Sequence, residues 1–227
     1  MLTSWNALPK AMQNDNVRPY YQALKKKRFA LFIKRIGDIL LSLLLLVLLS
    51  PLFLIISLMI KYDSKGPIFY RQTRITRDGK PFKIFKFRTM VTDADKKGSL
   101  VTTDHDTRIT HVGHKIRDYR LDEIPQLLNI LRGEMTFVGT RPEVPKYVDS
   151  YTDEMLATLL LPAGVTSIAS IYYKDENKLI AQASDVDRVY IEDILPQKMK
   201  YNLHSLLDFG LMSDLRIMFL TIFHVVR

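Results

Sequence analysis

The longest apolar stretch of the chain runs from Ile39 to Ile60, 22 residues without a charged side chain. As one helix it would rise about 33 Å, just enough for a hydrocarbon core of roughly 30 Å. A simple transmembrane span is the first interpretation of such a pattern.

A break in this stretch and the charges around it favour a different path. Pro51 removes a helical hydrogen bond and kinks the helix, and the hydroxyl of Ser50 can satisfy the freed carbonyl. Residues 25–38 and 61–80 carry six Lys or Arg each. Because basic flanks stay in the cytoplasm, we predict a re-entrant helical hairpin over residues 32–62, kinked at Ser50 and Pro51.

The pattern in the rest of the chain predicts a helix-rich α+β domain with amphipathic interfacial helices. Alternating apolar residues around Asp78–Gly79 predict a β-hairpin within residues 66–90. The other patterns predict a polar loop (92–107), two short helices (111–121 and 123–132), a proline-bounded loop (138–145), a helix (146–161), a turn (161–167), a helix (185–195) and an apolar core or interfacial helix (214–226).

These elements predict three parts. Residues 1–31 form an N-terminal extension, polar and then basic, with no evident cleavable signal peptide and no role that the sequence indicates. Residues 32–62 form the membrane helix, and residues 63–227 form a small cytosolic catalytic domain.

The charge is unevenly distributed. The chain has a net charge of +9, and residues 25–88 hold 15 Lys or Arg against 3 Asp or Glu. A basic segment around an apolar run favours an anionic membrane surface, with phosphorylated ligands as a second partner class. Nucleic acid is not expected, because no nucleic-acid-binding motif is present. The absence of cysteine excludes disulfides and thiolate metal sites.

Two adjacent acids, Asp122 and Glu123, stand out in "RDYRLDEIPQLLNILRG", residues 117–133. One interpretation is structural: Asp122 caps the following helix, Glu123 complements the helix dipole, and Pro125 lies in the first turn. The other interpretation is catalytic, and the surrounding motifs favour it.

Several motifs follow one another along the chain in an order typical of one protein family. The kinked apolar run is followed by "GPIFYRQTR", "GKPFKIFKFRTM", "DTRITHVGHKIRDYRLDEIPQLLNILRGEMTFVGTRPEVP" and "PAGVTS". Over about residues 32–222 the chain resembles the bacterial sugar transferases of the monotopic phosphoglycosyl transferase family. The resemblance implies an enzyme at the cytoplasmic face of the bacterial inner membrane. It would move a sugar-1-phosphate from a nucleoside diphosphate sugar, usually a UDP-sugar, to polyprenyl phosphate. This step initiates assembly of a lipid-linked glycan for capsule, exopolysaccharide, O-antigen or glycoprotein.

The resemblance also implies roles for the two acids. Asp122 would be the nucleophile of a covalent phosphosugar–aspartate intermediate, Glu123 its partner, and both would hold Mg²⁺. The chemistry is compatible, since an ionised carboxylate can attack phosphorus and a helix N-terminus would favour its ionised form. A cation must offset the negative charges that meet, and Mg²⁺ prefers carboxylate and phosphate oxygens.

Basic residues would supply the remaining contacts. The candidates for phosphate or donor binding are Lys86, Arg88, Arg117, Arg141 and Pro142. The candidates for the lipid headgroup are Arg71 and Arg74, for which a solvated or lipid-facing basic surface is the competing interpretation.

Five positions depart from the family pattern. Arg141 and Pro142 match the loop Pro-Arg-Pro, which the resemblance implies binds the nucleotide, and Thr140 replaces its first proline. Ala163 lengthens the spacing in the Pro-Gly motif, and Ser167 replaces that motif's second glycine. His111 and His114 replace arginines and are expected to be surface substitutions rather than metal ligands.

Two rival functions are left open by the residues alone: a glycosyl transferase that releases the nucleoside diphosphate, and a membrane-anchored scaffold without catalysis. The transferred sugar, the glycan pathway and oligomerisation are not indicated by the sequence.

Overall fold

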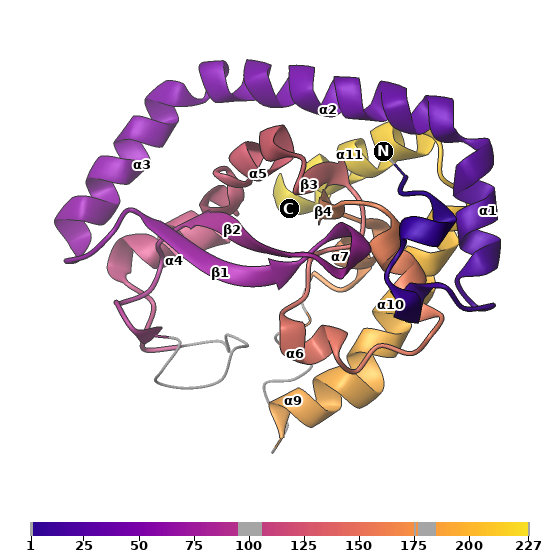
Figure 1. Cartoon of the computed structure of the whole chain (residues 1–227). Coiled ribbons are helices and arrows are strands. Elements are labelled where there is room, and N and C mark those ends of the chain that lie inside the picture. The colour runs from indigo at the N-terminus through magenta and orange to yellow at the C-terminus, as the bar shows by residue number, and fades with distance from the viewer. Residues whose placement is uncertain (1, 95–105, 175, 177–184, 227) are drawn as a thin grey trace.

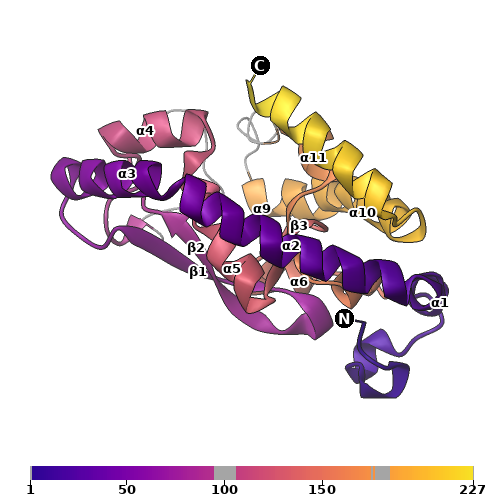
Figure 2. The same cartoon turned by 90° about the horizontal axis from the view of Figure 1, so that it is seen from above.

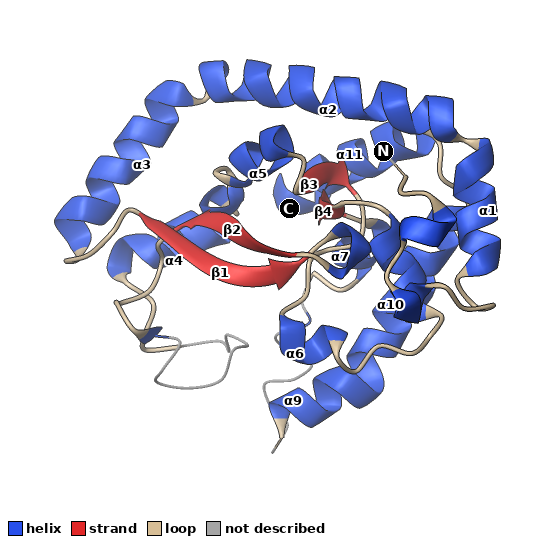
Figure 3. Ribbon diagram, viewed as in Figure 1, coloured by secondary structure: helices blue, strands red, loops and turns tan. Residues whose placement is uncertain are grey.

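The computed structural model describes residues 2–94, 106–174, 176 and 185–226. Helices dominate this part of the chain, and its strands form two separate pairs (Figures 1 and 3). The predicted helix-rich α+β class is therefore confirmed. The predicted loop at 92–107 falls mostly on residues 95–105, which lie outside the described residues.

The N-terminal segment is part of the main core. It comprises two 3₁₀ turns (Trp5–Ala7 and Lys10–Met12) and α1 (Arg18–Lys26). Its apolar side chains share one cluster with those of the C-terminal half of the chain, including Met12, Val17, Leu24, Leu160 and Phe209. The hydroxyl of Tyr20 donates to Oε1 of Glu154 at 2.6 Å, which ties α1 to the same region.

The apolar run forms two helices, α2 (Arg28–Leu48) and α3 (Ser50–Asp63), which bend by 62° where they meet. Within the described residues, neither helix alone is long and apolar enough to cross a membrane, whereas the bent pair together meets that criterion by length and composition. Figure 1 shows the pair as an open arch over the domain.

The bend has the predicted chemical cause. Pro51 has no N–H to donate to the carbonyl of Val47, and the hydroxyl of Ser50 donates to that carbonyl instead, at 2.8 Å. Leu49 leaves helical geometry, with φ −89° and ψ 1°. The kink therefore leaves no unpaired acceptor at Val47.

Polar side chains hold α2 against the domain. Arg35 donates to the carbonyls of Ile130 at 2.6 Å and Leu131 at 3.0 Å, which satisfies the C-terminal end of α5 (Gln126–Arg132). Asp38 is 6% exposed and accepts from the hydroxyl of Thr136 at 2.6 Å. Buried polar groups need such partners, so this face of α2 is fixed to the protein.

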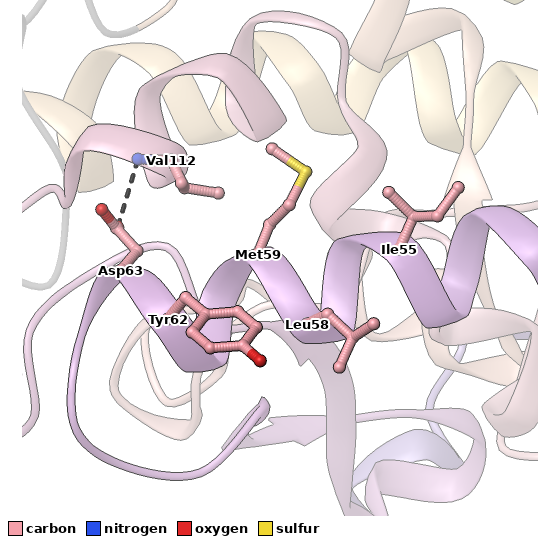
Figure 4. Close-up of a pocket in the computed structure, with 6 residues that line it drawn as sticks. All are labelled: Ile55, Leu58, Met59, Tyr62, Asp63 and Val112. Carbon is pink, nitrogen blue, oxygen red and sulfur yellow. Dashed lines mark hydrogen bonds between the residues drawn. The ribbon is translucent and has the colours of Figure 1, made fainter.

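The opposite face of the arch is apolar and exposed. It includes Phe29, Phe32, Ile36, Leu40, Leu44, Val47, Leu48, Leu54, Ile55 and Leu58. Figure 4 shows a shallow depression on α3, lined by Ile55, Leu58, Met59 and Tyr62 together with Val112 of α4 (His111–Asp118). An apolar surface of this extent marks an interaction site rather than a solvated face.

The helix α11 (Leu211–Val226) adds to this side of the molecule, where Figures 1 and 2 place it near α2. Lys34 of α2 and Asp214 of α11 form an ion pair at 2.5 Å. The inner face of α11 buries Ile217 in the core, and its outer face exposes Met212, Leu215, Phe219, Ile222 and Phe223.

The predicted hairpin is confirmed. Strands β1 (Phe69–Ile75) and β2 (Pro81–Phe87) are antiparallel, and the connecting turn holds Asp78 at φ 60° and Gly79 at φ 69°. Aromatic side chains attach the hairpin to α3, since the rings of Phe53 and Phe87 lie 4.7 Å apart.

The second pair of strands was not predicted. β3 (Met135–Val138) and β4 (Ala163–Thr166) are parallel, so the expected turn at 161–167 is wrong for its central residues. Two glycines allow close approach between the residue after β3, Gly139, and the beginning of β4, Gly164. A Cβ on Gly164 would lie 2.1 Å from the backbone oxygen of Gly139, inside any allowed contact.

The remaining helices differ from expectation mainly in their limits. The expected helix at 146–161 is two separate pieces, and the expected helix at 185–195 continues to residue 207. These elements are α6 (Pro145–Val148), a 3₁₀ segment (Met155–Leu160), α7 (Ile168–Tyr172), α9 (Val186–Val189), a π-helical turn (Tyr190–Ile194) and α10 (Leu195–Leu207).

Candidate active site

Asp122 and Glu123 lie in a single 3₁₀ turn (Leu121–Glu123) between α4 and α5. The turn begins after Arg120, which lies two residues beyond the end of α4 and has left-handed geometry at φ 52°. Non-glycine residues in this geometry are strained, and such strain is often found at functional sites. α5 begins only at Gln126, after Pro125 at the cap position, so the alternative interpretation, in which Asp122 caps this helix, does not hold.

Two cations hold Glu123. Lys86 on β2 donates to Oε1 at 2.8 Å, and Arg141 donates to both carboxylate oxygens, with 3.2 Å to Oε2. Burial alone would raise the pKa of Glu123, but the charges and hydrogen bonds of Arg141 and Lys86 hold it well below the usual range. Glu123 is therefore ionised at neutral pH.

Asp122 is in a different electrostatic state. Burial raises its pKa above the usual aspartate value; Lys86, with Nζ 3.5 Å from Oδ2, opposes the rise, and the charge of Glu123 adds to it. This corrects the expectation that a helix N-terminus favours the ionised form, because the 3₁₀ turn places Asp122 before α5 in a buried setting. A carboxyl group whose pKa is perturbed by burial and by charged neighbours beside a cavity is typical of a functional site.

A cavity of about 510 Å³ opens beside Asp122. Its lining contains most of the basic residues predicted to bind phosphate or a lipid headgroup: Arg71, Arg74, Lys86, Arg88 and Arg117. The structure thus brings together side chains from the hairpin, from α4 and from the 3₁₀ turn around one carboxylate. A cavity with this charge suits a diphosphate.

The guanidinium groups in this cavity have different partners. Arg71 lies over the ring of Phe85, with 4.2 Å from its guanidinium carbon to the ring centre. Arg88 is 5% exposed and donates to the carbonyls of Lys65 at 2.6 Å and Ser64 at 2.7 Å. Arg88 therefore holds the end of α3 against β2, and its predicted contact with the donor stays a prediction.

A second, more apolar cavity of about 370 Å³ opens beside Glu123 and Arg141. Leu45 and Leu49, which precede the bend of the arch, line it together with Ile124, Leu127, Phe137 and Ile222. The two acids therefore lie between a basic cavity on one side and an apolar cavity on the other.

The loop after β3 carries Arg141 and Pro142. The carbonyl of Pro142 accepts from Nη1 of Arg74 at 3.1 Å, and the carbonyl of Thr140 accepts from the backbone N–H of Gly164 at 2.8 Å. The Thr140 contact uses a backbone carbonyl that a proline would also offer, so the substitution keeps it. Arg141 also donates to the carboxylate of Glu123, so it orients that acid in addition to its predicted role in donor binding.

The other departures from the family pattern have local roles. Ala163 begins β4, and the hydroxyl of Ser167 caps α7 by accepting from the backbone N–H of Ser170 at 3.0 Å. His111 and His114 are exposed on α4, apart from the two acids.

Two residues of α5 were missed by the sequence reasoning. Asn129 is fully buried, accepts from the backbone N–H of Phe85 at 2.9 Å and donates to the carbonyl of Lys83 at 3.0 Å, so it fixes α5 to β2. Gln126 is 1% exposed and lines the apolar cavity, and its amide has no hydrogen-bond partner within the described part of the chain. Two carboxamides three residues apart in an apolar helix were the available signal.

The partners of the two acids bear on whether they can hold a metal ion. No group of three or more His, Cys, Asp or Glu that could hold a metal occurs among the residues the structure describes. Magnesium is commonly held by one or two carboxylates together with substrate phosphates, so two acids beside a phosphate-sized cavity are compatible with it. Asp122 fits this role better than Glu123, whose oxygens are already paired with Lys86 and Arg141.

Comparison with known proteins identifies the family of the chain. The sequence profile of the bacterial sugar transferases matches residues 29–227. The chain is 34% identical over 193 residues to the UDP-glucose:undecaprenyl-phosphate glucose-1-phosphate transferase of Klebsiella pneumoniae, covering 84% of this chain and 39% of that protein. It is 33% identical over 194 residues to the UDP-N-acetylgalactosamine-undecaprenyl-phosphate N-acetylgalactosaminephosphotransferase of Aeromonas hydrophila, covering 84% and 43%.

A shorter relative is matched over most of its length. The exopolysaccharide production protein ExoY of Sinorhizobium fredii is 33% identical over 204 residues, covering 83% of each chain. The Klebsiella and Aeromonas relatives are longer, and the chain spans about two fifths of their length. The profile match includes the arch, the hairpin and the acid pair, and the chain belongs to the bacterial sugar transferase family.

Proposed function

We propose that the protein transfers a sugar-1-phosphate from a UDP-sugar to polyprenyl phosphate and releases UMP. The observation that carries the proposal is the position of Asp122 and Glu123, paired with Lys86 and Arg141, between a basic and an apolar cavity. The names of the related proteins describe this reaction with an undecaprenyl-phosphate acceptor.

In the first half-reaction, an oxygen of Asp122 attacks the phosphorus that bears the sugar. A bond from this oxygen to phosphorus forms, the bond from phosphorus to the bridging oxygen breaks, and UMP leaves with the electron pair. The product is an acyl phosphate, a phosphosugar on Asp122. Arg71, Lys86 and Arg117 line the cavity in which the diphosphate would lie and offset its charge.

In the second half-reaction, a phosphate oxygen of the acceptor attacks the same phosphorus. The acyl phosphate bond breaks, Asp122 returns as a carboxylate, and the polyprenyl diphosphate sugar leaves. The apolar cavity beside Glu123 gives the lipid portion of the acceptor a path from the arch to the acids.

The other charged residues keep the reacting groups in place. Glu123 stays ionised, so it orients Lys86 and Arg141 and does not act as a proton donor. A magnesium ion, when bound to Asp122 and the donor phosphates, would supply further positive charge at the reacting phosphorus.

The proposal places the exposed face of α2 and α3 in the cytoplasmic leaflet of the inner membrane. The bend at Ser50–Pro51, the basic residues before α2 and after α3, and the exposed apolar side chains support a re-entrant path. The outer face of α11 would lie in the same interface.

Sidedness can be measured with single cysteines, because the chain has none of its own. Cysteines at the exposed positions Lys26 and Lys65 should both react with an impermeant reagent from the cytoplasmic side only. Labelling of the two positions from opposite sides would contradict the re-entrant path.

The reaction is tested by product identity. Detergent-solubilised protein is given polyprenyl phosphate and UDP-glucose or UDP-N-acetylgalactosamine, with and without magnesium chloride, and the released nucleotide is identified. UMP supports the proposal, UDP would indicate a glycosyl transferase, and no release with any donor of a broad UDP-sugar panel would favour a scaffold.

A further inference from the structure

A buried charged network lies behind the loop that carries Arg141. Glu143 and Lys198 of α10 are 7% and 5% exposed. The hydroxyl of Tyr190 joins them, because it donates to Oε1 of Glu143 at 2.6 Å and accepts from Nζ of Lys198 at 2.9 Å. Lys198 Nζ also lies 3.6 Å from the Glu143 carboxylate and 2.8 Å from that of Glu176.

The network is connected to the hairpin on its other side. Nη1 of Arg74 lies 4.0 Å from Oε2 of Glu143 and donates to the carbonyl of Pro142 at 3.1 Å. The carbonyl of Glu143 accepts from the backbone N–H of Ile75 at 3.0 Å. The segment Arg141–Glu143 is therefore held between β1 and α10.

Stability alone does not account for this arrangement. Burying an ion pair costs about as much in desolvation as it returns, and apolar residues of similar size usually stabilise a core at least as well. What the network supplies is a fixed geometry, because each charged group has partners from different elements. The residue whose position depends on that geometry is Arg141, two positions before Glu143.

The balance of charges in the network also indicates that it fixes the loop of Arg141. Among the residues that the structure describes, the ion pairs of this cluster join two cations, Arg74 and Lys198, with two acids, Glu143 and Glu176. Removing the charge of Glu143 leaves Arg74 and Lys198 in excess and leaves the hydroxyl of Tyr190 with a weaker acceptor. The loop would then lose a constraint on the side facing away from the reacting acids.

We infer that Glu143 and Lys198 are positioning residues that hold the Arg141 loop in the geometry that binds the nucleotide of the donor. The inference rests on the proposed function. Glu143 lies two positions after Arg141, and its partner Arg74 donates to the carbonyl of Pro142 between them, so the network acts on the donor through the position of Arg141. Their loss therefore weakens nucleotide binding more than it slows the chemical step at Asp122.

The test measures the dissociation constant of UDP for the full-length chain in detergent with magnesium chloride. The variants are Glu143→Gln, Lys198→Met, Arg141→Ala and the double variant Glu143→Gln/Arg141→Ala. Lys200→Met, at an exposed position on the same helix, is the matched control. Glu143→Gln and Lys198→Met are expected to weaken binding on the order of tenfold, in the range of networks that act at a distance.

The double variant separates positioning from a general structural effect. Since Glu143 acts through Arg141, Glu143→Gln should cause no further loss in the Arg141→Ala background. In turnover with UDP-glucose or UDP-N-acetylgalactosamine, whichever the wild type uses, Glu143→Gln should raise the donor KM about tenfold and leave kcat within about threefold.

Three outcomes would overturn the inference: unchanged UDP binding in Glu143→Gln, losses that multiply in the double variant, or a fall in kcat with the donor KM unchanged. If Glu143→Gln does not fold, Tyr190→Phe removes only the bridging hydroxyl and should weaken binding about threefold, and unchanged binding would overturn the inference equally. Wild-type protein that binds no UDP would contradict the proposed function itself, which is a distinct result.

Discussion

Replacing Lys86 with methionine removes a cation that contacts both acids, at 2.8 Å from Glu123 and 3.5 Å from Asp122. Methionine keeps most of the side-chain volume, so the change is mainly one of charge. The expected result is a large loss of activity at pH 7 that is partly recovered at higher pH.

The magnitude follows from the geometry. At 3.5 Å and an effective dielectric constant of about 20, the attraction between Lys86 and ionised Asp122 is about 5 kcal/mol. Desolvation of Lys86 offsets part of this, and a loss of about 3 kcal/mol is typical when one partner of a buried pair is removed. At about 1.4 kcal/mol per factor of ten, kcat/KM at pH 7 falls about a hundredfold.

The assay follows UMP release between pH 5 and 9. Burial already raises the pKa of Asp122, and Lys86 is the main group that opposes the rise. Loss of Lys86 raises this pKa further, so the acid limb of the kcat/KM profile moves to higher pH. Activity is then lost as pH falls through the raised pKa of Asp122.

Two variants serve as controls. Lys83→Met, at an exposed position on the same strand, should leave the rate unchanged, and Lys86→Arg should retain most of it. Activity of Lys86→Met within about threefold of wild type, with an unmoved acid limb, would refute the assignment of Lys86 to the acids.

Three further changes test the acid, the arch and the strand ends. Asp122→Asn should abolish turnover and raise the melting temperature at pH 7. The pKa of Asp122 is raised in the folded state, so the ionised carboxylate destabilises the fold at pH 7, and this destabilisation disappears as pH falls. A difference in melting temperature between variant and wild type that grew at low pH would contradict the assignment. Asp38→Ala leaves the hydroxyl of Thr136 without its acceptor and should lower the free energy of unfolding in urea by about 2 kcal/mol, whereas Asp38→Asn should cost less. Gly164→Ala places a Cβ 2.1 Å from a backbone oxygen and should lower stability and activity together. The control is Gly37→Ala, whose Cβ would meet nothing within 4 Å, and it should leave thermal stability unchanged or slightly higher.

The parts of the fold that could be predicted depend on local chemistry. The hairpin follows from a turn at Asp78–Gly79 between alternating residues, and the bend in the arch follows from Ser50–Pro51. Each involves groups within a few positions of one another. A sequence pattern reports such interactions directly.

The parallel pair β3 and β4 could not be predicted for the opposite reason. Its strands have four residues each and lie more than twenty positions apart, so each strand alone resembles a loop. The glycines that permit their close approach are visible in the sequence, but the partner that each one meets is not.

The composition of the site was predictable, and its electrostatics were not. The basic residues around Asp122 are visible as a charge pattern, and the family motifs assign them to one site. The raised pKa of Asp122 and the lowered pKa of Glu123 depend on burial and on which acid Arg141 faces. The network of Glu143 and Lys198 joins residues 55 positions apart and has no sequence signature.

The covalent intermediate is the central claim, and mass spectrometry of protein incubated with the UDP-sugar alone tests it most directly. The tryptic peptide Leu121–Arg132 contains Asp122, and the account predicts that it gains the mass of the sugar phosphate and loses it again when polyprenyl phosphate is added. The contradicting result is a peptide that stays unmodified, although the same protein forms product at the normal rate once the acceptor is supplied.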